Sequence, residues 1–157
     1  VDAVLIGDTG TGAAMIVPAL RKQGIKTARI LGTDQWNLDG KLSSNAAMRG
    51  AWFASVPDNN YLKYAEKYRT RFGKAPVRLS SLGYDAVLMV IRVAQDWKLG
   101  TVFPTNGRLV QKEASLGVDG AFRFLPSGLS ERLLQVQEVQ AGKFVTVDPA
   151  PTSFLGN

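Results

Sequence analysis

The 157-residue sequence contains neither cysteine nor histidine. Without cysteine the chain can form no disulfide and no thiolate metal site, and without histidine it lacks the commonest general base and the commonest metal ligand. A hydrolytic site of the Ser-His-Asp or Cys-His kind is therefore excluded within this chain. These absences favour a protein that is not an enzyme, and we expect neither a metal nor a cofactor.

Long apolar runs are also missing. The longest one, AVLMVI at residues 86–91, is interrupted by Arg92 and is far shorter than the ~20 apolar residues of a membrane-spanning helix. With 45% hydrophobic and 20% charged residues, the composition is ordinary for a globular protein that builds its own core.

Positive charge is in excess, with a net charge of +6 and an isoelectric point near 9.8. Such a balance suits an anionic partner, but most of the cations are scattered along the chain. The densest cluster, YLKYAEKYRTRFGK at 61–74, has aromatic residues at helical spacing. This pattern predicts a helix with a buried aromatic stripe and a solvated basic face. It favours a solvated surface over a nucleic-acid surface, and no nucleic-acid partner is expected.

The stretch VLIGDTGTGAA, residues 4–14, is typical of a strand, a glycine-rich turn and the start of a helix. Gly7 and Gly12 have the separation of a P-loop, but Ala13 and Ala14 replace its lysine and its metal-binding hydroxyl. Met15 stands where a dinucleotide fingerprint needs a small residue. Both motifs for phosphate binding are therefore incomplete.

Two aspartates bear on the same question. Asp8 adds a negative charge that would repel a phosphate, whereas Asp34 lies at about the distance expected of a ribose-binding acid. A nucleotide-binding enzyme of the Rossmann kind thus remains as a remote alternative. Two interpretations of the turn remain. In the first, it offers backbone N–H groups to a polar ligand; in the second, its glycines only redirect the chain. Gly10 and Gly12 are expected to adopt backbone angles that alanine reaches poorly.

The order of elements predicts the α/β class. We expect a fully buried strand at 1–7 and further strands at 27–32 and 51–56, with helices at 12–24, 59–73, 79–97 and 104–114. Residues 117–148 alternate apolar and polar side chains and predict two or three antiparallel strands. A strand-helix-strand-helix-strand start indicates a right-handed parallel unit. Three parallel strands and a long apolar helix without cover indicate that part of the fold lies outside this chain.

With its elements in this order, the sequence resembles the C-terminal portion of the type I periplasmic solute-binding proteins, the family of the leucine/isoleucine/valine-binding protein. The resemblance rests on VDAVLIGDTGTGAAMIVPALRKQGI, ILGTDQWN, GAWFASVPDNNYLKYAEKYRTRFGKAP, SSLGYDAVLMVIRVA and GVDGAFRFLPSG. The segments LGYDA and RGAWFASVP are also similar to a second branch of the fold, the outer-membrane lipoprotein activators of penicillin-binding proteins.

This resemblance implies a two-lobed protein that closes on a small ligand between its lobes. Residues 1–147 would form the second lobe, a three-layer α/β sandwich with a mainly parallel sheet and a late antiparallel hairpin. Helices at about 79–115 would pack on a first lobe preceding Val1, and residues 148–157 would be an extended tail. The ligand would lie at the carboxyl ends of the parallel strands.

The resemblance also implies binding residues. In amino-acid-binding members an acidic residue after the second strand of this segment holds the ligand ammonium group, and Asp34, followed by Gln35, matches it. The turn after the first strand contributes a side chain, often aromatic, and here Thr9 and Gly10 stand in its place. The loss of the aromatic wall weakens the case for a simple amino-acid receptor. The alternative role of Asp34 is that of a turn or capping residue.

Two aromatic residues complete the candidate site. Tyr84, at the start of the LGYDA helix, resembles an aromatic residue that faces the cleft in the family. Trp36 is not a family residue; in its glycine-flanked loop it is interpreted as an exposed stacking or interface residue, or else as packed under its own loop.

Three functions follow as hypotheses. The first is a non-catalytic, periplasmic domain of an ABC-transporter binding protein, which binds a small polar solute such as an amino acid and docks on a membrane permease. The second is an outer-membrane-anchored lipoprotein that activates a cell-wall synthase by protein contact, and the third is the remote nucleotide enzyme. The isolated chain is expected to associate with itself through the helix at 82–97.

Overall fold

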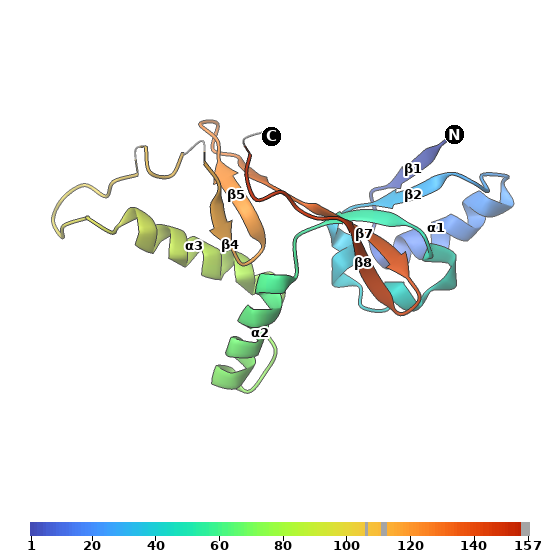
Figure 1. The fold of residues 1–157 in the computed structure, drawn as a ribbon, viewed down its shortest axis with the longest axis horizontal. Coiled ribbons are helices and arrows are strands. Elements are labelled where there is room, and N and C mark those ends of the chain that lie inside the picture. The colour runs from blue at the N-terminus through green and yellow to red at the C-terminus, as the bar shows by residue number, and fades with distance from the viewer. Residues whose placement is uncertain (106, 111–112, 155–157) are drawn as a thin grey trace. The chain divides into compact units, whose positions relative to one another are not determined.

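The computed structural model describes residues 1–105, 107–110 and 113–154, which divide into two compact units. Unit 1 comprises Val1–Val56 and Leu134–Ala150, and unit 2 comprises Pro57–Leu133 and Pro151–Asn157 (Figure 1). The assignment of residues 1–147 to the second lobe of a two-lobed protein, with 148–157 as an extended tail, stays a prediction. Within the described ranges, every helix is too short or too polar to cross a membrane.

Unit 1 is built on a five-stranded sheet in the order β1-β2-β3-β7-β8. Strands β1 (Ala3–Ile6), β2 (Arg29–Gly32) and β3 (Trp52–Ser55) are parallel. Strand β7 (Gln135–Gln140) pairs antiparallel with β3 and forms a hairpin with β8 (Lys143–Asp148). The α/β class, the parallel start of the sheet and the late antiparallel hairpin are thereby confirmed.

One face of this sheet is covered by helix α1 (Gly10–Lys22) and by 3₁₀ turns at Asp34–Leu38, Leu42–Ser44 and Ala46–Met48. The core between the layers contains Ile6, Ala13, Val17, Ile30, Trp36, Leu42, Met48, Ala51, Phe53 and Val139.

Strand β1 is not fully buried, contrary to the prediction for 1–7. Val4 and Ile6 pack on the core, but Leu5 between them is 68% exposed. The reason is that alternate side chains of a strand point to opposite faces, and β1 is an edge strand of the sheet.

Unit 2 combines two helices with a small antiparallel sheet. Helix α2 (Asn59–Phe72) ends at Gly73, whose φ of +69° suits glycine, and helix α3 spans Ser80–Val93. Strands β4 (Ser115–Gly117), β5 (Gly120–Phe124) and β6 (Ser130–Arg132) pair in that order. The buried apolar core is small and consists of Met89, Val93 and Phe122, with Phe103, Leu109 and Phe124 packed against it.

The expected helix at 104–114 is wrong for the residues that the structure describes there, 104–105, 107–110 and 113–114, none of which is helical. Gly107 has a φ of +73°, outside the right-handed helical region. Arg108 instead donates a hydrogen bond to the carbonyl of Val93 at the end of α3. Helix α3 itself ends at Val93 and does not continue to Trp97.

Candidate functional site

The candidate ligand residues of unit 1 lie at the carboxyl ends of neighbouring strands. Ile6 of β1 is paired in parallel with Gly32 of β2, so the residues that follow both strands share one edge of the sheet. The structure therefore brings the turn that contains Thr9 and Gly10 to the same edge as Asp34 and Gln35. Whether a ligand binds there stays a prediction.

Thr9 is the N-cap residue of α1. Its Oγ1 accepts a hydrogen bond from the N–H of Gly12 at 3.1 Å, which satisfies one of the free donors at the helix start. The N–H of Thr9 in turn donates to Oδ1 of Asp8 at 2.6 Å. The turn is thus held by its own side chains.

The two glycines at the start of α1 are needed for space and not for unusual backbone angles. Neither Gly10 nor Gly12 has a positive φ, so the expectation about their angles is wrong. A Cβ atom on Gly12 would lie 2.6 Å from the carboxyl group of Asp8, and one on Gly10 would lie 3.0 Å from Oδ2 of Asp39. Both glycines make room for carboxylates.

This edge of the sheet is acidic. Asp8 and Asp39 pack against the start of α1, where Asp39 Oδ2 accepts a hydrogen bond from the Thr11 hydroxyl at 3.0 Å. Asp34 is exposed at the start of the first 3₁₀ turn. Within the described part of the chain, none of these three carboxylates forms an ion pair with a cation. Such an edge attracts an ammonium group and repels a phosphate.

Trp36 is buried beneath this edge, and its interpretation as an exposed stacking residue is wrong. Its side chain is 0% exposed, and its indole N–H donates to the carbonyl of Asp8 at 2.9 Å. The ring packs 6.0 Å from the ring of Phe53 and lies so close to Gly32 that a Cβ there would clash with it. The alternative, packing under its own loop, is what the structure has.

Tyr84 belongs to unit 2. It lies in α3, is 46% exposed, and its ring centroid is 5.2 Å from that of Tyr64 in α2. Its participation in a ligand site with residues of unit 1 stays a prediction.

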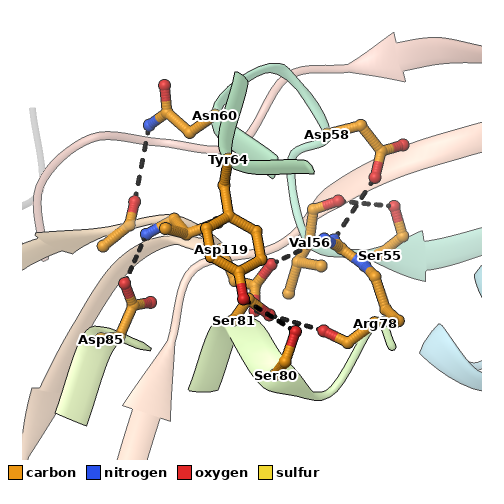
Figure 2. A network of polar contacts seen from close by, with 12 residues as sticks. Ser55, Val56, Asp58, Asn60, Tyr64, Arg78, Ser80, Ser81, Asp85 and Asp119 are labelled. Atoms are coloured by element: carbon orange, nitrogen blue, oxygen red, sulfur yellow. Dashed lines mark hydrogen bonds and ion pairs between the residues drawn. The ribbon is translucent and has the colours of Figure 1, made fainter. Parts of the chain in front are cut away.

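A polar network in unit 2 was not expected from the sequence (Figure 2). The guanidinium group of Arg78 lies 3.4 Å from Asp58 and 3.0 Å from the buried carboxylate of Asp119, and it stacks 3.7 Å from the ring centroid of Tyr61. The Ser81 hydroxyl donates to Asp119 at 2.6 Å. A buried ion pair of this kind adds little net stability, because the cost of desolvating both charges offsets their attraction.

A second part of the network ties α3 to the turn between β4 and β5. Asp85 is 4% exposed and accepts a hydrogen bond from the N–H of Val118 at 2.7 Å. Gly117 allows this approach, because a Cβ there would clash with the Asp85 carboxyl group. The signal in the sequence was an acid inside the apolar run of LGYDAVLMVI, since a buried carboxylate needs a partner.

No protein-family model matches the chain, and no curated protein matches it in sequence. Solved structures do match. One is assigned to branched-chain amino acid ABC transport in Rhodospirillum rubrum, with 21% identity and a TM-score of 0.78 over 93% of this chain and 44% of the other. The substrate-binding protein LivJ of Streptococcus pneumoniae, in complex with isoleucine, has 20% identity and a TM-score of 0.59 over 96% of this chain and 45% of its own.

LpoA of Haemophilus influenzae matches with 18% identity and a TM-score of 0.62, over 94% of this chain and 26% of its own length. The chain thus spans less than half of each of these three proteins. At such low identity the likenesses show the fold alone. The chain has the fold of the corresponding part of these solved structures, in agreement with its resemblance in sequence to the type I periplasmic solute-binding proteins.

Proposed function

We propose that this chain is part of an extracytoplasmic solute-binding protein of the ABC-transporter type. It performs no chemistry and supplies one side of a site for a small polar solute that carries an amine, such as an amino acid. The observation that carries this proposal is the acidic edge of unit 1, where Asp34 is exposed beside the capped turn of α1. Likeness to the isoleucine-bound LivJ structure supports it.

In this proposal the ligand ammonium group binds the carboxylate of Asp34, with Gln35 and Thr9 beside it. Gly10 contributes backbone at the same turn, and Tyr84 is a further candidate only through the resemblance in sequence. Trp36 makes no direct contact, because it is fully buried. Its indole N–H stabilises the turn by donating a hydrogen bond to the Asp8 carbonyl.

The first test uses the chain alone. Because it spans less than half of the solved binding proteins, we expect no micromolar affinity for any free amino acid in calorimetric titration. Micromolar binding by the 157 residues alone would contradict a site shared between two lobes.

The second test uses a form of the protein that binds an amine-bearing ligand. Asp34→Asn should weaken that binding by ~1.5–3 kcal/mol, the scale of a charge-assisted hydrogen bond. Asp2→Asn is the matched control, since Asp2 is exposed just before β1, at the other end of that strand. Equal affinities for both variants would assign Asp34 to the loop alone.

A second candidate is the activator lipoprotein of penicillin-binding proteins, a periplasmic or outer-membrane-anchored protein that contacts a cell-wall synthase. Likeness to LpoA supports it, as does the exposed apolar surface of α3, where Val87, Val90 and Ile91 are 53–61% exposed. Direct binding of a purified penicillin-binding protein, with no response to amino acids in a thermal-shift screen, would favour this candidate over the first.

A further inference from the structure

Three arginine side chains gather in one small pocket of unit 1. Arg21 lies in the last turn of α1, Arg29 opens β2, and Arg49 follows the 3₁₀ turn at Ala46–Met48. The pocket has a volume of about 290 Å³, and among the described residues that line it none is acidic. A pocket of this size and sign suits a small anion.

The pocket lies at the amino ends of β2 and β3. Ala28 and Ala51, which precede these strands, form part of its lining. The acidic edge lies at the other end, because Asp34 follows β2. The chain also passes to unit 2 after β3 and returns before β7 at that other end, since Ser55 pairs with Gln135. The pocket is thus formed by unit 1 alone, away from the expected solute site and from the connections to unit 2.

Arg21 is held in place by the loop that follows α1. Its Nη1 atom donates hydrogen bonds to the carbonyls of Ile25, Lys26 and Ala28 at 2.8, 2.7 and 3.1 Å. Every hydrogen bond that the structure gives this side chain starts from Nη1. A guanidinium group has five N–H donors, so those on Nε and Nη2 are available to a ligand. An arginine fixed in this way loses little freedom when it binds an anion.

Arg29 and Arg49 differ in how far their charge is compensated. Nη1 of Arg29 donates to the Gly50 carbonyl at 2.7 Å and lies 3.8 Å from the Glu138 carboxylate. Its guanidinium group also stacks 4.4 Å from the ring centroid of Trp52. The Arg49 side chain is exposed and, in the described part of the chain, forms neither a hydrogen bond nor an ion pair. Arg49 is therefore the least compensated cation of the pocket.

The cations of α2 are arranged differently. Lys63, Lys67 and Arg71 are exposed along the helix, as the basic face predicted from the sequence requires. The aromatic residues beside them do not form the fully buried stripe that the spacing predicts: Phe72 is 55% exposed. These cations lie outside the pocket, so they provide matched controls for it.

We propose that this pocket binds the carboxylate group of a small aliphatic acid. The guanidinium groups of Arg21 and Arg49 would donate hydrogen bonds to its oxygens, since their planar N–H groups match the two oxygens of a carboxylate. The short carbon chain would lie against Ile30 and Ala47, which also line the pocket. This site is separate from the proposed solute site and does not depend on it.

Charge and size argue against other anions. The Glu138 carboxylate, 3.8 Å from Arg29, repels a ligand more strongly when the ligand carries two negative charges, as a phosphate group can near neutral pH. A nucleotide is too large, because a volume of about 290 Å³ is at the lower limit of small-molecule sites. Both considerations favour a monovalent acid with few carbon atoms.

The experiment follows the backbone amide chemical shifts of the isotope-labelled chain by NMR during titration with sodium propionate. Sodium chloride keeps the ionic strength constant, so that general screening does not change. Propionamide has the shape of propionate without its charge, and inorganic phosphate has charge without a carbon chain. We expect saturable shifts with propionate at Thr27, Ala47 and Gly50, weaker binding of phosphate, and no binding of propionamide.

Variants then locate the site. Arg49→Gln should weaken propionate binding at least about fivefold, and Arg49→Lys, which keeps the charge but loses the planar group, should bind with intermediate affinity. Arg71→Gln is the matched control, because it removes the same charge outside the pocket, and it should stay within about twofold. Asp34→Asn should also leave propionate binding unchanged, since Asp34 lies at the other end of β2.

Several outcomes would overturn the proposal: no saturable shifts, shifts scattered over the surface, equal binding of propionamide, tighter binding of phosphate, or an equal loss in Arg71→Gln and Arg49→Gln. Circular dichroism checks that the variants fold. If Arg49→Gln does not fold, Arg49→Lys decides, and it should bind propionate less tightly than the unaltered chain.

Discussion

Replacing Trp36 by phenylalanine tests whether unit 1 depends on this residue as a core support. The indole fills the space between β2, β3 and the turn after β1, and it is fully buried. Phenylalanine would keep an aromatic ring near Phe53 but leave the carbonyl of Asp8 without its indole donor.

The magnitude follows from two losses. One hydrogen bond to a partly buried backbone carbonyl contributes about 1 kcal/mol, and the missing part of the ring leaves a cavity in a close-packed core. Together they should lower the free energy of unfolding by roughly 1.5–3 kcal/mol. Trp97→Phe is the matched control: its indole also donates to a backbone carbonyl, that of Thr101 at 3.0 Å, but Trp97 is 36% exposed. Water can replace that bond, so its loss should cost under about 0.5 kcal/mol.

Urea unfolding followed by far-ultraviolet circular dichroism measures both variants. Acrylamide quenching gives an independent check, because only Trp36→Phe should remove the tryptophan emission that the quencher cannot reach. The reasoning is refuted if Trp36→Phe unfolds at the same urea concentration as Trp97→Phe, or if the protected emission persists without Trp36.

Further predictions concern pH, association and nucleotides. Hydrogen bonds from Trp52 and Gln140 and the charge of Arg29 lower the pKa of Glu138. The stability this adds is present above about pH 5 and is lost as the pH falls through the lowered pKa. Glu138→Gln should therefore make the free energy of unfolding change less with pH across that range. The chain should self-associate in light scattering, and Ile91→Lys, at a position 61% exposed, should return it to a monomer; a monomer at every concentration contradicts this. ATP, GTP and NAD should leave its melting temperature unchanged, with or without magnesium, and a concentration-dependent rise would reverse that conclusion.

The helices of this chain were largely predictable because local signals set them. Apolar spacing and a following glycine located α1 and α2 closely, and Gly24 and Gly73 both have the positive φ that such an end requires. The same reasoning failed at 104–114, where Gly107 also has a positive φ but lies inside the expected helix. There Arg108 contacts the end of α3, and apolar spacing carries no signal of such a contact.

The site was predictable only as far as topology decides it. Parallel strands place the residues after β1 and β2 at one edge, so Thr9 and Asp34 could be expected there. The packing of Asp39 against Gly10 joins residues far apart in sequence, and no short motif encodes it. The burial of Trp36 could not be predicted from the sequence either, because the exposure of a loop residue depends on which elements pack against it.

The carboxylates around the glycine-rich start of α1 disfavour phosphate binding there, although the start of a helix is a common phosphate site. The N–H groups at the start of a helix normally attract an anion. Here two carboxylates of the chain itself lie beside that position: Asp8 accepts a hydrogen bond from the N–H of Thr9, the residue before the helix, and Asp39 accepts one from the Thr11 hydroxyl. A phosphate would approach these carboxylates against their negative charge, whereas an ammonium group would be attracted by them and by Asp34 at the same edge of the sheet. We therefore expect the glycine-rich turn to favour a positively charged group over a phosphate, even though the whole chain is basic.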